Sequence, residues 1–264
     1  MTQTGPTGTI DLGGIGVIAP GTSLVGSSLA FQGAGGTTIA NMFDANGDLN
    51  KRIDGIRYDS PSLAGFQLGA SYGEASGVRN YQAPAAGIGS PNVAGDLGNA
   101  YAVNLRYAGE MSGVRIAAGV GYERLNEDGV VTPAGSTKTV YGGSLSLMHV
   151  PTGLFVQGHY NRYRTVEAVT ATGNVWHIAG GIAQNWFGIG NTSLYGEYGR
   201  GSNMWAVNTN NLANVGNLSF WGIGMVQHVN AAAMQLYLGY RSYSSSRAVD
   251  PSISVIGGGA RIAF

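Results

Sequence analysis

The chain has 264 residues, of which 45 are glycine and 11% are charged, whereas average proteins contain about 7% glycine and about 25% charged residues. Acidic and basic side chains number 14 each, so there is no basic surplus for a nucleic-acid backbone, and the 44% apolar content argues against a disordered chain. Cysteine is absent, which excludes disulfides, thiolate metal sites and cysteine nucleophiles.

The first segment, 1–50, is irregular and rich in glycine, and it begins without the charged and apolar regions of a signal peptide. Residues 13–16 (Gly-Gly-Ile-Gly) precede no helical pattern, so we interpret them as a flexible loop and not as a nucleotide-binding turn. Residues 44–50 imitate the start of a calcium-binding loop. Gly55 stands where that loop needs its closing glutamate, which argues against calcium.

From residue 51 onward, apolar residues alternate with small or polar ones, which is the period of a β-strand with two different faces. In 114–123, for example, Val, Ile, Ala, Val and Tyr occupy the even positions. No run of 18 apolar residues occurs, so no membrane-spanning helix is predicted. The alternation predicts eleven strands, at 51–59, 65–75, 98–108, 113–123, 138–149, 153–163, 174–186, 191–201, 218–229, 233–243 and 253–264.

The connections between these strands alternate between short and long. The short ones are 60–64, 109–112, 150–152, 187–190 and 230–232, and the long ones, rich in glycine and asparagine, are 76–97, 124–137, 164–173, 202–217 and 244–252. Short turns at one end and long loops at the other are typical of an outer-membrane β-barrel. A soluble sandwich also alternates, but its water-facing side would be rich in Lys, Glu and Thr, and here that side is mostly small or uncharged.

Aromatic residues on the apolar face gather at two levels. The set beside the long loops is Tyr72, Tyr101, Tyr122, Tyr141, Tyr160, Trp176, Tyr198, Trp221 and Tyr240. A sparser set beside the short turns is Tyr58, Phe66, Tyr107, Trp186 and Phe264. Two aromatic girdles are expected where a barrel meets the two membrane interfaces. The chain is therefore predicted to be all-β, a transmembrane antiparallel β-barrel.

The face opposite the apolar one should line the lumen. By this parity the predicted pore-lining residues are Lys51, Arg57, Gln67, Asn104, Arg106, Arg115, Glu123, Gln157, His159, Asn161, His177, Glu197, Gln235, Arg241 and Arg261. Arg106 and Arg115 flank one short turn and are expected to be lateral neighbours. Together with Arg57 they form a basic wall that either opposes acids of 1–50 or pairs with carboxylates nearby.

Catalytic and metal motifs are missing from the sequence. His149, His159, His177 and His228 lack metal-binding spacing, and His159 and His177, on one face of adjacent strands, are interpreted as solvated. No histidine matches the depth of Ser193, which argues against a barrel hydrolase. We expect no cofactor, no metal and no enzymatic activity.

Two segments carry a family resemblance. Residues 57–66, with Arg-Tyr-Asp-Ser-Pro followed by Gly-Phe, resemble a turn of the trimeric general porins of Gram-negative outer membranes. The last strand, 257–264, resembles the signal read by the outer-membrane insertion machinery, with Ile262 and Phe264 as its alternating apolar residues. The strand pattern extends the resemblance over 51–264.

The resemblance implies a barrel of sixteen strands and a homotrimer in the outer membrane. Counting back from Phe264, segment 51–59 becomes the sixth strand, and 1–50 falls where the constriction loop belongs, with Asp11, Asp44 and Asp48 as its acids. An odd number of strands would place the two ends of the chain on opposite sides of the membrane. The open edge of an unclosed sheet cannot face lipid. We therefore expect that the first five strands precede this sequence. The alternative is that 8–18 and 23–32 are extra strands of a smaller barrel.

These observations predict a porin that lets small hydrophilic solutes and ions diffuse passively through a water-filled pore. Its expected partners are outer-membrane lipid, those solutes and the insertion machinery, with no nucleic acid. Two alternatives are an outer-membrane barrel enzyme and a structural or adhesin barrel. The last would fill its lumen with packed side chains, whereas small residues dominate the predicted lumen face.

Overall fold

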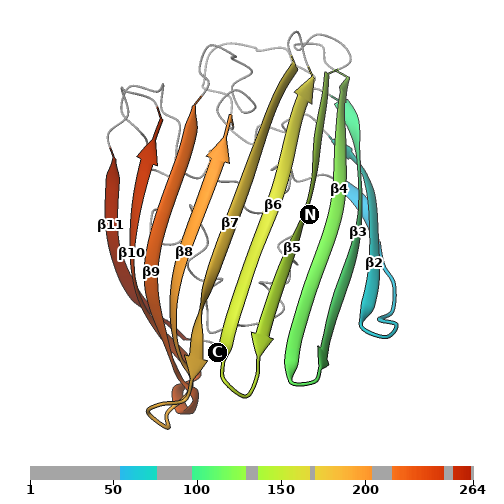
Figure 1. The fold of residues 1–264 in the computed structure, drawn as a ribbon. Coiled ribbons are helices and arrows are strands. Elements are labelled where there is room, and N and C mark those ends of the chain that lie inside the picture. The colour runs from blue at the N-terminus through green and yellow to red at the C-terminus, as the bar shows by residue number, and fades with distance from the viewer. Residues whose placement is uncertain are drawn as a thin grey trace, which may run out of the picture.

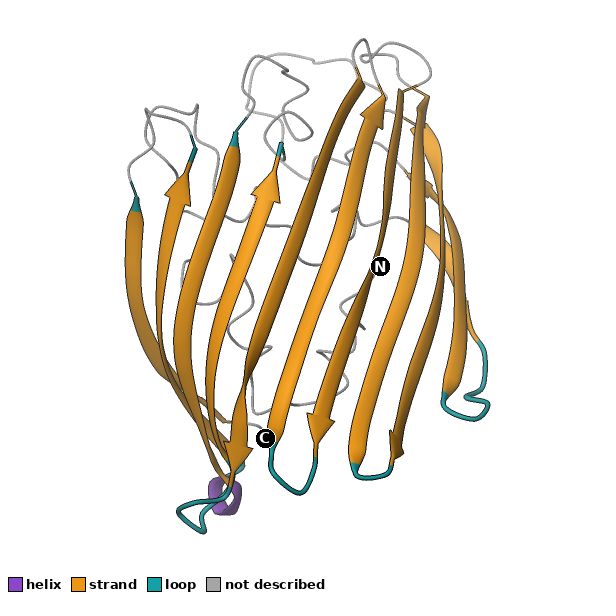
Figure 2. Ribbon diagram, in the orientation of Figure 1, coloured by secondary structure: helices purple, strands orange, loops and turns teal. Residues whose placement is uncertain are grey.

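A computed structural model describes residues 54–75, 97–128, 136–166, 170–203, 216–246 and 252–262. These residues form one curved sheet of eleven antiparallel strands, in which each strand pairs with its neighbours in sequence (Figures 1 and 2). The strands are β1 (Asp54–Asp59), β2 (Phe66–Ala75), β3 (Leu97–Met111), β4 (Val114–Asp128), β5 (Ser136–His149), β6 (Leu154–Val166), β7 (Thr170–Gln184), β8 (Thr192–Ser202), β9 (Asn217–Val229), β10 (Met234–Ser245) and β11 (Ile253–Ile262). The all-β class and the eleven predicted strands are confirmed.

Several strands run further toward the long loops than predicted. β4 continues to Asp128 and β7 begins at Thr170, inside the segments 124–137 and 164–173 that were predicted as loops. Backbone pairing continues there, with Glu127 opposite Ser136 and Val166 opposite Thr170. The ladder needs only backbone donors and acceptors, so it extends beyond the part of each strand where side chains alternate between apolar and polar.

The short turns adopt the backbone conformations that tight hairpins require. Ser112 and Gly113, between β3 and β4, have φ of 51° and 76°, and two positive φ angles define the type I′ turn that matches the twist of paired strands. One turn of 3-10 helix, η3 (Asn230–Ala232), joins β9 to β10. In the described part of the chain, no helix has the length and apolar character needed to cross a membrane.

The two faces of the sheet differ in chemistry. One face, here called the outer face, exposes large apolar side chains along every strand, among them Ile56 at 74%, Val120 at 60% and Ile223 at 58%. A water-soluble protein rarely exposes so continuous an apolar surface. The opposite, inner face carries most of the charged side chains together with a buried cluster formed by Ala117, Phe155, Ala183, Tyr195 and Val226. The inner face is therefore more densely packed near the short turns than the sequence predicted.

The predicted girdle beside the long loops forms a continuous band on the outer face. Its members pair directly at every second strand interface, as in Tyr72–Tyr101, Tyr122–Tyr141, Tyr160–Trp176 and Tyr198–Trp221. At the interfaces between, the band steps by two residues, and the rings of Trp176 and Tyr198 still lie 5.3 Å apart. This regular stagger keeps the band level in strands that tilt, as the strands of a barrel must.

Inner-face glycines provide room for large side chains on the neighbouring strand. Gly224 lies opposite Tyr195, Gly199 opposite Phe220 and Gly222 opposite Arg241. A Cβ atom added to Gly224 would lie 2.7 Å from Cε1 of Tyr195, and one added to Gly222 would lie 2.9 Å from Cγ of Arg241. These glycines let the bulky side chains lie flat against the sheet, which explains part of the high glycine content.

Gly224→Val is expected to destabilise the barrel by about 1–3 kcal/mol, because the new side chain overlaps the Tyr195 ring in a packed cluster. Urea unfolding in phospholipid vesicles measures the difference. Gly196→Val is the matched control, since a Cβ there meets only the Gly222 carbonyl oxygen at 3.9 Å. Equal losses of stability in the two variants would contradict the proposed role of Gly224.

Candidate functional site

The inner face of the sheet holds the candidate site, because directly paired residues of antiparallel strands project to the same side. Every predicted pore-lining residue that falls on a described strand lies on this face. They are Arg57, Gln67, Asn104, Arg106, Arg115, Glu123, Gln157, His159, Asn161, His177, Glu197, Gln235, Arg241 and Arg261. Outside the described residues are Lys51, Asp11, Asp44, Asp48 and Phe264. Ile262 ends β11 on the outer face and is 51% exposed.

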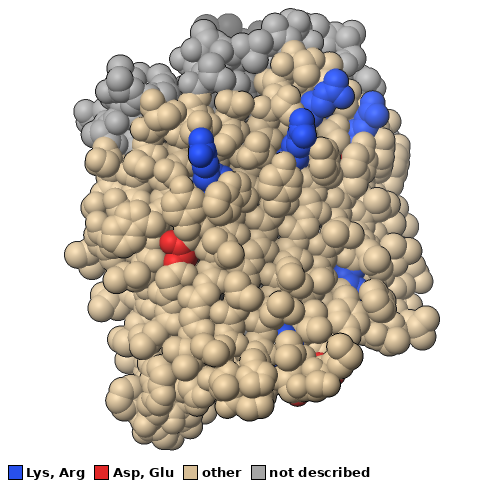
Figure 3. Space-filling model, viewed as in Figure 1, with Lys and Arg blue, Asp and Glu red and all other residues tan. Residues whose placement is uncertain are grey.

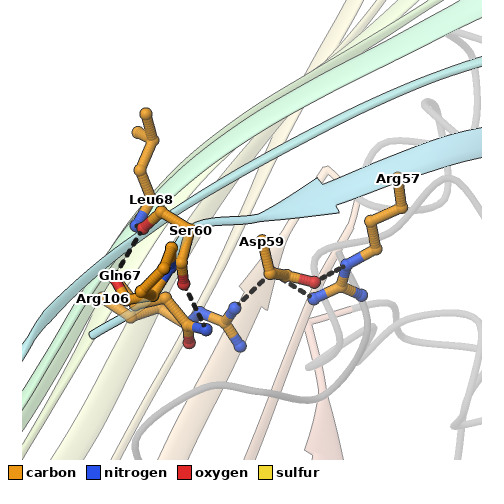
Figure 4. A network of polar contacts seen from close by, with 7 residues as sticks. Arg57, Asp59, Ser60, Gln67, Leu68 and Arg106 are labelled. Atoms are coloured by element: carbon orange, nitrogen blue, oxygen red, sulfur yellow. Dashed lines mark hydrogen bonds and ion pairs between the residues drawn. The ribbon is translucent and has the colours of Figure 1, made fainter.

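A first cluster of charges lies beside the turn between β1 and β2 (Figure 4). Asp59 accepts two hydrogen bonds from Arg57, at 2.6 Å to Nε and 2.9 Å to Nη2, and a third from Arg106 Nη2 at 2.5 Å. Gln67 Nε2 donates to the Ser60 carbonyl at 3.0 Å beside them, while Leu68 projects from the opposite side of the strand (Figure 4). Two guanidinium groups share the Asp59 carboxylate, so these three described side chains together carry a net positive charge.

The predicted basic wall pairs with carboxylates close by. Arg57 and Arg106 contact Asp59, and Arg115 Nη2 lies 3.3 Å from Glu110 Oε2. Arg106 and Arg115 are not the lateral neighbours that we predicted, because Arg106 pairs with Gly119 and Arg115 with Glu110. The turn between the strands contains only residues 112 and 113, so the two arginines stand at unequal distances from it. This offset spreads positive charge along the inner face.

A second cluster, on β7, β8 and β10, is buried. Glu197 accepts hydrogen bonds from Arg241 Nε at 2.6 Å and Nη2 at 3.0 Å, and His177 Nε2 lies 3.0 Å from Glu197 Oε2. The side chains of Glu197 and Arg241 are 1% and 0% exposed. Sequence reasoning placed these residues on one face but did not predict their contact, which depends on register across three strands.

Aromatic rings surround this buried cluster. The Phe220 ring stacks at 5.7 Å on the imidazole of His177, and the guanidinium carbon of Arg241 lies 5.3 Å from its centroid. His159 and His177 pair directly across β6 and β7, and their rings lie 5.4 Å apart. No group of three metal-ligating side chains occurs among the described residues. Charged side chains and aromatic rings are therefore in contact with one another in this part of the inner face.

Several buried polar atoms of the inner face have no protein partner among the described residues. They include Ser146 Oγ, His159 Nε2, Ser193 Oγ and the Tyr195 hydroxyl. Buried polar groups that lack protein partners are satisfied by water in native proteins. With fixed charges of both signs, such a face can order water and select solutes by charge and size, whereas the outer face suits lipid.

Comparison with known proteins agrees with this architecture. A search of the curated proteins found no match. Among solved structures, OccK8 (OprE) of Pseudomonas aeruginosa aligns with a TM-score of 0.51 and 8% identity over 78% of this chain and 56% of its own. OccK9 (OpdG) of the same organism has a TM-score of 0.47 and 15% identity over 79% and 66%. The chain thus spans 56% of the OccK8 structure and 66% of the OccK9 structure.

The match to a family model covers most of the chain. The family model described as Gram-negative porin matches residues 2–248, which include most of the two-faced sheet and both charge clusters. The aromatic band and the apolar outer face are what a wall of an outer-membrane channel requires. This chain belongs to the Gram-negative porin family.

Proposed function

We propose that this chain forms much of the wall of a water-filled channel through which small hydrophilic solutes and ions diffuse passively across the outer membrane. The observation that carries the proposal is the contrast between the exposed apolar outer face and the charged inner face with its unpartnered polar atoms. Planar-bilayer recording of the full-length protein should show stepwise, ohmic conductance. A folded barrel without conductance would contradict the proposal.

The cluster at Asp59 supports a role in charge selection. Asp59→Asn removes a carboxylate that contacts both Arg57 and Arg106, so the local field becomes more positive. Reversal potentials in a salt gradient should then shift toward anion preference. Arg106→Gln instead removes a positive charge from the same cluster and should shift the reversal potential toward cation preference. Shifts of the same sign in both variants would exclude this cluster from the ion path.

We also propose that the channel has no catalytic activity. Ser193, the one serine weighed as a nucleophile, pairs with Ala183 and Val226, and its hydroxyl forms no hydrogen bond with a histidine in the described sheet. A nucleophilic serine needs a base within hydrogen-bonding reach. The surroundings of Ser193 therefore favour a structural role.

Three further proposals rest on the family resemblance. Residues 1–50 would act as the constriction segment, with Asp11, Asp44 and Asp48 facing the basic inner face. The terminal residues Ile262 and Phe264 would be read by the outer-membrane insertion machinery. The folded protein would assemble as a homotrimer, and cross-linking in the membrane should trap trimers. A monomer mass in mild detergent would contradict that assembly.

A further inference from the structure

Arginines on the outer face form a group that the channel function does not use. The sequence Tyr-x-Arg recurs on three strands, with Arg124 on β4, Arg162 on β6 and Arg200 on β8 following girdle tyrosines. Across the strand pairs, these arginines lie opposite Tyr101, Tyr141 and Trp176. Each therefore stands one outer-face position beyond the aromatic band, on the side of the long loops.

A fourth arginine extends the group. Arg164 lies two residues beyond Arg162 on the same face of β6 and pairs with Thr139 and Thr172. We call Arg124, Arg162, Arg164 and Arg200 the outer arginines. Figure 3 shows basic side chains gathered across this end of the face, over the ends of β4 to β8.

Within the part of the chain that the structure describes, the outer arginines have no acidic partners. Arg162, Arg164 and Arg200 are exposed, and no carboxylate among the described residues forms a salt bridge with them. Arg124 donates Nε to Asn126 Oδ1 at 2.9 Å, which leaves its outer nitrogens available. The residues that pair with the group are uncharged, among them Thr172, Asn174 and Ser219. The group thus presents concentrated positive charge beside hydroxyl and amide groups.

The position of the outer arginines relative to the membrane determines which ligands they can bind. They project from the lipid side of the barrel and cannot reach the lumen, and they stand beyond the aromatic band at the depth of lipid headgroups. Guanidinium groups bind phosphate in a bidentate manner and hold their charge at any physiological pH. Strands β6 and β8 are two strands apart, which separates their arginines by roughly 10 Å.

We propose that the outer arginines bind a lipid of the outer leaflet whose sugar headgroup carries two phosphates. The arginines of β6 and β8 are two strands apart, so each position can bind a separate phosphate of a ligand that carries two. The hydroxyl and amide side chains beside them can form hydrogen bonds with sugar hydroxyls. The proposal depends on the outer-membrane location and not on which solutes pass through the pore.

Native mass spectrometry of the folded full-length protein in detergent provides the test, with diphosphorylated lipid A as the probe. The probe should remain bound, whereas dephosphorylated lipid A and inorganic phosphate at equal concentration should not. The combined variant Arg162→Gln, Arg164→Gln and Arg200→Gln should lower affinity by at least about ten-fold. Lys138→Gln is the matched control, because Lys138 lies at a similar height on β5 but on the inner face, paired with Leu125 and Thr165.

Unchanged affinity in the combined variant, or an equal loss in Lys138→Gln, would overturn the proposal. Folding of each variant is checked by heat-modifiable mobility in gels. If the combined variant does not fold, the wild-type chain still decides the question, because equal binding of phosphorylated and dephosphorylated lipid A would exclude phosphate recognition. Competition by inorganic phosphate as effective as that of the lipid would point to a free anion site and would also overturn the proposal.

Discussion

Leu145→Arg is expected to destabilise the membrane-inserted barrel by about 2–4 kcal/mol, because a guanidinium at that depth must leave water or deform the bilayer. Leu145 lies on the outer face of β5, four residues from the girdle residue Tyr141, and is 47% exposed. Urea unfolding in phospholipid vesicles measures the loss, and heat-modifiable mobility reports whether the barrel folds at all.

Ser144→Arg is the matched control on the adjacent residue. Ser144 pairs with Gly119 and His159 on the inner face, so its replacement by arginine should leave folding intact and reduce conductance. The same contrast is expected between Val120 and Gly119 on β4. If the inner-face variants fail to fold while the outer-face variants fold normally, the assignment of the two faces is inverted.

Arg241→Met is expected to destabilise the barrel by about 3–5 kcal/mol, because it leaves the Glu197 carboxylate buried without its principal counter-charge. Arg57→Gln provides a comparison at an exposed pair. The side chains of Arg57 and Asp59 are 39% and 31% exposed, so that loss should be no more than about 1 kcal/mol. Equilibrium unfolding of both variants gives the comparison.

A double variant distinguishes lost charge pairing from lost packing. In a Glu197→Gln background the carboxylate that Arg241 contacts is gone, so Arg241→Met should then cost much less than it does in the wild-type chain. An equal cost in both backgrounds would show that Arg241 stabilises the sheet through its other contacts, among them Phe220, and not through Glu197.

The eleven strands and the girdle could be predicted from sequence because their signals are local. Alternation with period two specifies a strand with two faces, and its phase assigns each residue to one of them, as for Arg106 and Leu105. The Tyr122–Tyr141 and Tyr160–Trp176 pairs follow once short turns fix the register between consecutive strands.

The charge clusters depend on information that local patterns do not carry. Glu197 and Arg241 are separated by β9, and they meet because Gly222 opposite both leaves room for the guanidinium to cross. Asp59 could have been recognised as a partner of Arg57, since residues two apart on a strand share a face. Its contact with Arg106 required the register of β1, β2 and β3.

The central claim is that the inner face lines a water-filled pore, and cysteine accessibility during single-channel recording tests it most directly. The natural chain contains no cysteine, so single substitutions can be introduced without background reaction. A charged, membrane-impermeant thiol reagent should reduce the conductance of Ser144→Cys and Gly119→Cys in discrete steps and leave Leu145→Cys and Val120→Cys unchanged. Block of the outer-face variants, or no block of the inner-face variants, would contradict the claim.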